Sequence, residues 1–502
     1  MKKYLWVLIL LALILFFSSV DIVGLAFQPA NSFYYRPDTD INVYFTYLDQ
    51  ARTGRFWFCN QFAVEQDPCK LFFPLWYVGG QLGNWFNLSN LVIIMITRIV
   101  LLAVFFYLLW LFVKKIFPDK RLASWLLVIF SSGLYLYYLH GSFFISALQN
   151  PLNIFIAILL LLLLWLSVNL WAKFSLKLSL WLMPLSFFII LAHPYEAFVL
   201  IINYGLLILL AACLAPKKIN QAILIFLFMA VGILLSGFYY FKIFTQIPAY
   251  QGWLMDNYLP FKGWLSVLVN EGLLLPFSLL GLWLVFKNKK ITDSWLVIVS
   301  WFGGGFAAVL LPLYVNIKFL LVWYFGLAFL GLLGFWWTVN FLPRRFRAII
   351  TVFLVGLLLA GNFYFYFDEI KEVFAAEPPR YLPVSYLEPL NWLKHNASID
   401  NVVLASPSWD TFLSGYSGLK SLVGSNQVFQ QEEKRALVFW FFKNNNQDDL
   451  KKTFLQKYNI DYLYYSPREQ ALGSFDPVTK DYLKLKYQNS WAKVYRVILN
   501  LK

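Results

Sequence analysis

The sequence predicts a polytopic α-helical membrane protein with a long extracytoplasmic loop after its first span and a small α/β domain at its C-terminus. Of the 502 residues, 60% are hydrophobic and only 13% are charged. A soluble domain cannot hide so much apolar surface, because its exterior must be largely polar. The chain becomes polar from about residue 368, so we expect a transmembrane domain over 1–367 and an extracytoplasmic soluble domain over 368–502.

About eleven segments are apolar and long enough to cross roughly 30 Å of hydrocarbon. They lie at about 4–20, 90–113, 122–139, 151–171, 178–192, 197–215, 220–241, 264–286, 294–312, 319–341 and 348–367. The opening Met-Lys-Lys resembles the start of a signal peptide, but residues 18–26 contain no convincing small-residue cleavage site. We therefore expect a retained signal anchor and a cytoplasmic N-terminus.

The basic residues favour this orientation, because short cytoplasmic loops carry the excess of Lys and Arg. Every second loop between the expected spans is basic, through Lys114, Lys115, Lys120, Arg121, Lys173, Lys177, Lys217, Lys218, Lys287, Lys289, Lys290, Arg344, Arg345 and Arg347. An odd number of spans then places the C-terminal domain outside. The net charge of +15 is scattered between apolar runs rather than gathered in one stripe, so it argues against nucleic-acid binding.

The acidic residues gather on the opposite face. Of the 26 Asp and Glu residues, 15 lie from Asp368 onward, and six of the remaining 11 lie in the first outer loop, about 21–89. For three of the six, Asp21, Asp49 and Asp67, the simplest interpretation is that they solvate the loop.

The first outer loop is too long and too aromatic for a disordered linker. It contains the stretches FYYRPDTDINVYFTYL, GRFWFCNQF and LFFPLWYVGG. We expect amphipathic helices that lie in the outer membrane interface, where Trp and Tyr rings prefer to sit. Cys59 and Cys69 both fall in this loop, where an oxidising compartment would permit a disulfide, although two cysteines ten residues apart are a weak signal for one.

The order of these features resembles the membrane-embedded glycosyltransferases of the C-type fold (GT-C), which use polyprenyl-phosphate sugars. The resemblance follows Asp40, Tyr44, Leu48, Ala51, Gly54, Asn60, Glu65, the stretch FFPLWYVGGQLG, Arg98, HPYE at 193–196, and a tail from LNWLKHNASIDNVVLAS to WAKVYRV. It is similar to bacterial members of uncharacterised function and covers nearly the whole chain. The order and spacing carry the resemblance, since no single motif is diagnostic.

The resemblance implies a carboxylate in the first outer loop that acts as a base or a metal ligand. Asp40 matches this position best, and Asp38 precedes it by one residue. In an extended segment the two side chains would point the same way, so they could share a divalent cation such as Mg²⁺ or Mn²⁺. The alternative for Asp38 is an ordinary turn residue after Pro37.

Transfer from a lipid phosphate also needs cations that stabilise the departing phosphate. Arg98 lies within the second span, where an ionisable residue is a functional candidate by default; it either grips phosphate or pairs with Asp40 or Glu65. Lys318 lies near the outer end of the tenth span, at a position where the family grips phosphate, and Arg36 is a further outer cation. Each cation has the alternative role of a lipid-headgroup anchor.

His193 and Glu196 interrupt an apolar stretch at an outer turn, where Pro194 explains the break. Such a titratable pair could line the acceptor cavity or help to bind a cation. The alternative is a hydrogen-bonded helix end. A closed zinc site is disfavoured, because the chain has three His and no HExxH or CxxC spacing. The glycines of WFGGGF, residues 301–306, lie inside a span and predict close helix packing.

In the C-terminal domain, alternating patterns predict helices and strands of a small α/β fold. The expected helices are 386–396, 431–444 and 448–459, and the expected strands are 401–406, 460–466 and 492–499. This domain contains no set of nucleophile, base and orienting residue, so we expect it to rest on the catalytic loop and shape the acceptor entrance.

These observations predict an inverting glycosyltransferase of the plasma membrane with its active site on the extracytoplasmic face. Its substrates would be a polyprenyl-phosphate-linked sugar and an acceptor lipid, glycan or protein. The main alternative is a transporter or flippase of a lipid-linked glycan, but transporters usually show internal repeats and polar residues near the midplane. A third class is a sensor or scaffold whose outer domain does the binding.

Overall fold

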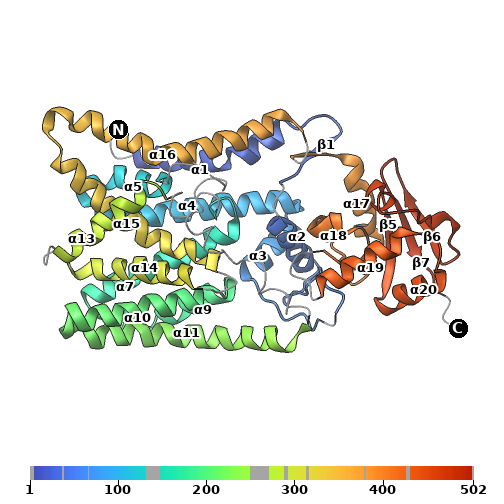
Figure 1. The fold of residues 1–502 in the computed structure, drawn as a ribbon, viewed down its shortest axis with the longest axis horizontal. Coiled ribbons are helices and arrows are strands. Elements are labelled where there is room, and N and C mark those ends of the chain that lie inside the picture. The colour runs from blue at the N-terminus through green and yellow to red at the C-terminus, as the bar shows by residue number, and fades with distance from the viewer. Residues whose placement is uncertain are drawn as a thin grey trace. The chain divides into compact units, whose positions relative to one another are not determined.

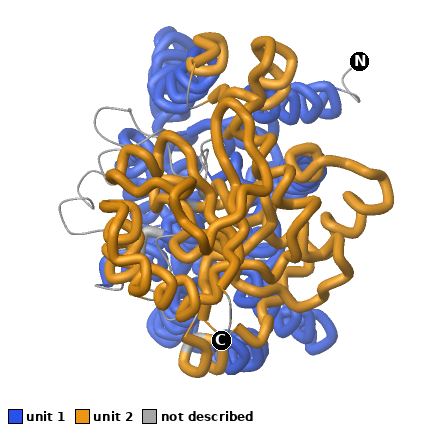
Figure 2. Tube along the Cα trace, turned by 90° about the vertical axis from the view of Figure 1, so that its right-hand side faces the viewer, with its two compact units in different colours: residues 1–20, 96–240, 257–371 blue, residues 21–95, 241–256, 372–502 orange. Residues whose placement is uncertain are grey.

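The computed structural model describes residues 5–36, 39–65, 67–131, 147–248, 271–287, 292–311, 316–377, 380–424 and 430–499. They fall into two compact units, which Figure 2 shows in different colours. Unit 1 comprises residues 1–20, 96–240 and 257–371, and unit 2 comprises residues 21–95, 241–256 and 372–502. The predicted first outer loop therefore clusters with the C-terminal residues.

Unit 1 is built from long apolar helices (Figure 1). The helices are α1 (Leu5–Ala26), α4 (Asn90–Ile116), α5 (Arg121–Phe130), α7 (Pro151–Ala172), α8 (Leu176–Ser179), α9 (Leu182–Ala192), α10 (Glu196–Leu214), α11 (Ile219–Gln246), α13 (Leu274–Lys287), α14 (Thr292–Leu310), α15 (Leu320–Phe341) and α16 (Arg344–Ala375). Short 3-10 turns lie at η1 (Pro118–Lys120), η2 (Pro216–Lys218) and η4 (Asn316–Phe319). The ends of α1, α4, α11 and α16 belong to unit 2.

Within the described ranges, seven helices are long and apolar enough to cross a membrane, namely α1, α4, α7, α10, α11, α15 and α16. Three further apolar helical stretches are shorter: 176–192, 274–287 and 294–310. The residue range of each of these helices overlaps that of a predicted span, and α5 forms the first part of the span expected at 122–139. The expectation of a polytopic helical membrane protein is confirmed.

α15 runs through the interior of unit 1, where α13 and α14 pack along it. In the most apolar part of α15, 83% of the residues are buried, against 22% in α16. α16 thus leaves most of its apolar surface uncovered by protein, as a helix bordering lipid does.

The glycines of WFGGGF lie in α14, where two neighbouring helices approach its backbone. A Cβ atom on Gly304 would lie 2.3 Å from Oδ1 of Asn203 in α10, and one on Gly305 would lie 2.8 Å from Cα of Trp323 in α15. Any larger residue would push these helices apart. The predicted role of the glycines in close packing is confirmed.

Unit 2 joins the first outer loop to the C-terminal domain through a small sheet. Strand β1 (Ser32–Tyr34) pairs antiparallel with β2 (Tyr381–Pro383). Two helices follow β1 in the loop, α2 (Thr39–Arg52) and α3 (Pro74–Trp85). Tyr34 and Tyr381, which are 347 positions apart in the sequence, are thus held next to one another.

The C-terminal domain is a five-stranded mixed sheet in the order β4-β3-β5-β7-β6. Its strands are β3 (Val402–Leu404), β4 (Lys420–Ser421), β5 (Ile460–Tyr465), β6 (Leu483–Gln488) and β7 (Lys493–Val497), and its helices are α17 (Leu387–Asn396), α18 (Asp410–Ser417), α19 (Gln431–Lys443), α20 (Asp448–Lys457) and α21 (Pro467–Gln470), with 3-10 turns at η5 (Val384–Tyr386), η6 (Pro407–Trp409) and η7 (Pro477–Thr479). β3 runs parallel to β4 and β5, whereas β7 runs antiparallel to β5 and β6.

Both faces of this sheet are covered by helices. Successive residues of a strand point to opposite faces, and β5 accordingly sends Leu463 into one apolar cluster and Tyr464 into another. The first cluster contains side chains of α19 and α20, and the second contains side chains of α17 and α18. The result is a three-layer domain. The alternating pattern predicted its α/β fold but not the arrangement of the layers.

Candidate active site

Asp40 lies in the first turn of α2, in unit 2, and its side chain is exposed. A carboxylate is favoured there, because the N-terminus of a helix carries a partial positive charge. The expectation that Asp38 and Asp40 share one extended segment is not met at Asp40, because that residue is already helical. Asp38 lies outside the described residues.

Three side chains fix the chain just before Asp40. Asp21, at the end of α1, accepts hydrogen bonds from the Tyr34 hydroxyl at 2.9 Å and from Nη1 of Arg36 at 3.2 Å. Burial, together with the charge of Asp21, raises the pKa of Tyr34, so this residue stays a neutral donor. Asp21 is itself buried, so the expectation that it solvates the loop is wrong. Arg36 forms an ion pair with Asp21, and its role toward phosphate stays a prediction.

Helix α2 is anchored to the C-terminal domain on the side of Asp49. Lys394 of α17 donates to both carboxylate oxygens of Asp49 at 2.7 Å, and Asn90 donates to the same carboxylate at 2.9 Å. Nearer to Asp40, the amide of Asn42 donates to Oγ1 of Thr411 in α18 at 3.0 Å. Asp49 is buried rather than solvated, because its charge is met by a lysine 345 residues away.

The turn after α2 is held by polar contacts and a disulfide. A disulfide bond joins Cys59 to Cys69. Gln50 bonds both backbone groups of Cys59, at 2.7 Å to the N–H and 3.0 Å to the carbonyl oxygen. Asp67 accepts from the backbone N–H groups of Asn60 and Cys69 at 2.6 and 2.9 Å. Asp67 therefore orders the turn instead of only solvating it.

Two more ion pairs join this loop to the C-terminal domain. Glu65 pairs with Lys434 of α19, whose side chain is only 2% exposed. Burial lowers the pKa of Lys434, and the hydrogen bond that Lys434 donates to Glu65 opposes this effect. Arg55 pairs with Asp400 at 2.7 Å nearer to solvent. We call Asp49–Lys394, Arg55–Asp400 and Glu65–Lys434 the three loop–domain ion pairs.

A cleft of about 560 Å³ lies beside α2 within unit 2. It is lined by Leu25, Gln28, Phe33, Tyr34, Phe45, Arg52, Asn87, Leu88, Ser89, Asn90, Leu91, Leu387, Asn391, Lys394, His395, Gly415 and Tyr416. The lining combines amides, cations and aromatic rings, a mixture that suits a hydroxyl-rich ligand. Its members come from α1, β1, α2, α4, α17, α18 and the segment before α4, so no local motif in the sequence could reveal it.

Arg98 is buried in α4, in the part of that helix that belongs to unit 1. Its guanidinium group donates to the backbone carbonyl of Phe17 in α1. This contact lowers the cost of placing a charge at that depth.

His193 and Glu196 meet at the turn between α9 and α10, also in unit 1. Nδ1 of His193 lies 3.2 Å from Oε1 of Glu196, which is fully buried and begins α10. Oε2 of Glu196 has no hydrogen-bond partner within the described parts of the chain. The predicted pairing of these residues is present, and a buried carboxylate oxygen is left over for a donor.

Lys318 lies in η4, directly before α15, and is half-buried. A divalent cation would need several oxygen ligands. Over the residues whose placement is described, no three His, Cys, Asp or Glu side chains gather to hold a metal. The described residues therefore provide no set of metal ligands that includes Asp40, and the divalent cation stays a prediction.

No protein-family model matches the chain, and no curated protein matches it. Solved structures do match in fold. The oligosaccharyltransferase AglB of Archaeoglobus fulgidus, in complex with an inhibitory peptide and a dolichol-phosphate, superposes with a TM-score of 0.59 at 11% identity, over 98% of this chain and 74% of that chain.

Two further structures agree. ArnT from Cupriavidus metallidurans, bound to undecaprenyl phosphate, gives a TM-score of 0.54 at 11% identity over 99% of both chains. The arabinofuranosyltransferase AftD from Mycobacteria gives 0.56 at 13% identity, over 99% of this chain and 42% of that chain. All three are GT-C glycosyltransferases, and the chain has the GT-C fold.

Proposed function

We propose that this protein is an integral-membrane glycosyltransferase that moves a sugar from a polyprenyl-phosphate donor to an extracytoplasmic acceptor with inversion at the anomeric carbon. The observation that carries the proposal is the fold. The chain matches ArnT over 99% of both chains, and AglB and ArnT were solved with dolichol-phosphate and undecaprenyl phosphate. The carboxylate of Asp40, at the start of a helix in the first outer loop, supplies the group that such chemistry needs.

In the proposed reaction an acceptor hydroxyl or amide attacks the anomeric carbon from the side opposite the phosphate. Its proton passes to the Asp40 carboxylate, which acts as general base. The bond between the anomeric carbon and the phosphate oxygen breaks, and polyprenyl phosphate leaves with the electron pair. Arg98, Lys318 and Arg36 are the proposed cations for that phosphate, since fixed positive charges stabilise the charge that develops on it.

The cleft beside α2 is the proposed place for the polar part of the acceptor. Phe45 and Tyr416 present aromatic surface, and Asn391 and Gln28 offer amide donors and acceptors. The three loop–domain ion pairs keep the cleft and α2 in one arrangement, so that the acceptor and Asp40 are held together.

The experiment is to reconstitute the purified protein in lipid with a panel of radiolabelled polyprenyl-phosphate sugars and to measure the release of polyprenyl phosphate. With the productive donor, Asp40→Asn should lower turnover by roughly 10²- to 10⁴-fold, the usual contribution of a general base, and leave the melting temperature unchanged. Asp38→Asn, measured in parallel, decides which carboxylate is the base. Asp481→Asn, at a side chain that is 82% exposed in the C-terminal domain, is the matched control and should keep full activity.

Two results would contradict the proposal. Release at the wild-type rate by Asp40→Asn and Asp38→Asn would remove the proposed base. No release from any donor by a folded protein, together with movement of the intact lipid-linked sugar between leaflets, would favour the transporter.

A further inference from the structure

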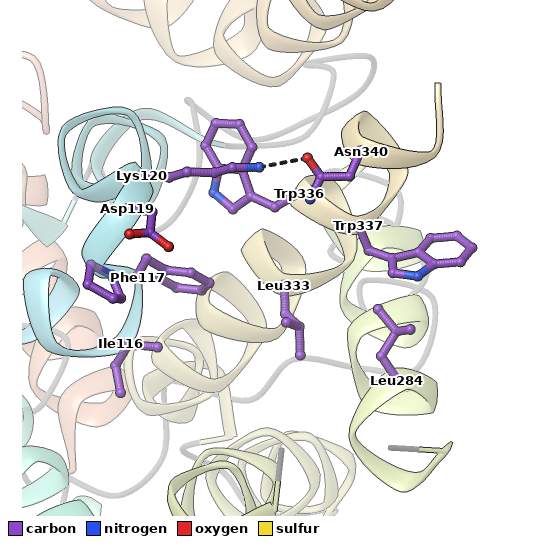
Figure 3. Close-up of a pocket in the computed structure, with 10 residues that line it drawn as sticks. Ile116, Phe117, Asp119, Lys120, Leu284, Leu333, Trp336, Trp337 and Asn340 are labelled. Carbon is purple, nitrogen blue, oxygen red and sulfur yellow. Dashed lines mark hydrogen bonds between the residues drawn. The ribbon is translucent and has the colours of Figure 1, made fainter. Parts of the chain in front are cut away.

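A second pocket lies in unit 1, where the ends of several apolar helices meet. Its volume is about 310 Å³, and it is lined by Ile116, Phe117, Pro118, Asp119, Lys120, Leu284, Leu333, Trp336, Trp337 and Asn340 (Figure 3). These residues come from the end of α4, from η1, from α13 and from the last turns of α15. The proposed transfer reaction uses none of them.

Two cations from different loops converge on one residue of this pocket. Nζ of Lys120 donates to the side-chain oxygen of Asn340 at 3.1 Å. Arg347 lies next to the lining residue Asn340 but is not itself in the lining; its Nη2 donates to the backbone oxygens of Asn340 at 2.8 Å and of Leu342 at 3.1 Å. Arg347 belongs to the first turn of α16. The loop that contains Lys120 and the loop that contains Arg347, both predicted to be cytoplasmic, are therefore neighbours in space. Their positive charges lie close to one another.

These cations have unused hydrogen-bond donors. An ammonium group has three N–H donors, and for Lys120 the described residues supply one acceptor, Asn340. The Nε of Arg347 is buried and has no hydrogen-bond partner in the described part of the chain. Burial and the charge of Arg347 both lower the pKa of Lys120, whereas Asp119 raises it. A bound anion would relieve the repulsion and take up the donors.

The rest of the lining selects an amphiphilic anion rather than a small soluble one. The Lys120 ammonium lies over the ring of Trp336, 4.2 Å from its centroid. Below it, Leu284, Leu333 and Ile116 provide an apolar wall, as Figure 3 shows. The carboxylate of Asp119 lies toward the base of the Lys120 side chain, away from the ammonium group (Figure 3). Indole rings and basic side chains at the ends of spans are the groups that meet lipid headgroups.

We propose that this pocket binds the phosphodiester headgroup of an anionic phospholipid, with Lys120 and Arg347 on the phosphate and Leu284 and Leu333 against the start of an acyl chain. The lipid would link the loop before α5 to the loop between α15 and α16. It would thereby fix the helix ends of unit 1 on the face that the basic loops predict to be cytoplasmic.

The test is a titration of the detergent-solubilised full chain with a short-chain phosphatidylglycerol or a short-chain phosphatidylcholine, followed by thermal unfolding. Each basic side chain near an anionic surface is worth roughly a fivefold preference. The wild type should therefore reach half of its stabilisation at a phosphatidylglycerol concentration roughly 5- to 25-fold below that of phosphatidylcholine. Lys120→Gln/Arg347→Gln should respond equally to both lipids.

The matched control is Lys218→Gln. Lys218 also lies over an indole ring, 5.3 Å from the centroid of Trp171, but in another basic turn and outside the pocket. This variant should keep the preference for the anionic lipid. If the double variant does not fold, Lys120→Met, which keeps the alkyl chain over Trp336, gives the same comparison.

The proposal is overturned if the pocket variants keep the wild-type preference, or if Lys218→Gln loses it as fully as they do. Glycerol phosphate and inorganic phosphate form a further arm. Stabilisation by either at the concentration at which phosphatidylglycerol acts would show a soluble-phosphate site, and would also overturn the assignment to lipid.

Discussion

At the scale of single residues, the C-terminal domain contains one lysine whose burial sets a measurable pH dependence. Lys451 of α20 is fully buried, donates to the carbonyl oxygen of Asn444 and lies 4.4 Å from the ring centroid of Phe475. Burial, and to a smaller extent the charge of Lys480, lower its pKa to about 8, and the charge of Asp448 opposes both. The folded domain thus holds this proton less tightly than the unfolded chain does.

The sign of the effect follows from proton binding. Between pH 8 and about 10.4 the unfolded lysine keeps its proton while the folded one loses it, so this residue makes the free energy of unfolding rise with pH. Relative to Lys451→Met, the free energy of unfolding of the wild type should rise by about 1–3 kcal/mol across this pH window. Thermal unfolding of the full chain at pH 7.5, 9 and 10 measures the difference.

Lys452→Met is the control, because its side chain lies in the same helix but is 34% exposed and pairs with Asp481. It should change the unfolding free energy by the same amount at every pH. A wild-type minus Lys451→Met difference that stays flat from pH 8 to pH 10 would contradict the prediction.

At the scale of elements, the ion pair between Glu65 and Lys434 joins the first outer loop to α19. Removing one partner of a buried pair leaves a charge without compensation and typically costs about 3–5 kcal/mol, whereas replacing both is often near neutral. Glu65 is 19% exposed, which reduces the cost. We expect Glu65→Gln to destabilise unit 2 by about 2–3 kcal/mol, and Glu65→Gln/Lys434→Met to recover most of that loss.

A double-mutant cycle built on melting temperatures checks this coupling. Arg55–Asp400 provides the comparison, because its side chains are 28% and 55% exposed and exposed pairs contribute about 1 kcal/mol or less. Equal coupling energies for the two pairs would show that burial does not strengthen the contact of the loop with α19.

The same contacts show where sequence patterns stop being informative. Hydrophobic length predicted the helices of unit 1, and alternation predicted β3, β5 and β7, because those signals are local. α18 was not expected, since its sequence DTFLSGYS is rich in Ser and Gly and its helix is stabilised by burial of Phe412 and Leu413. The burial of Asp21 and Asp49 could not be read from the sequence either, because it depends on partners brought there by the fold.

At the scale of the whole molecule, the GT-C fold was predictable because it shows in the order of features along the chain. These features are a first span, a long aromatic loop, many further spans and a polar tail. The candidate site was predictable only in part. Asp40 and the pair of His193 and Glu196 stand out as polar residues in apolar or aromatic surroundings. The cleft beside α2 does not, because side chains from six separate elements form it.

The proposed chemistry also requires one orientation of the whole chain. With the first span entering from the cytoplasm and an odd number of spans, the basic turn η2 lies inside and the C-terminal domain outside. Cysteines placed at Lys217, which is exposed in η2, and at Asp481, which is exposed in the C-terminal domain, report the two sides. The exposed free Cys213 is first replaced by Ser.

On intact cells a membrane-impermeant maleimide should label Asp481→Cys, and it should label Lys217→Cys only after lysis. Labelling of the parent Cys213→Ser chain gives the background, because Cys59 and Cys69 are joined in a disulfide. Reversal of both results would show that the whole chain has the opposite orientation, with the first span entering from outside. The C-terminal domain, and with it the loop that carries Asp40, would then face the cytoplasm, and an extracytoplasmic acceptor could not reach the proposed base.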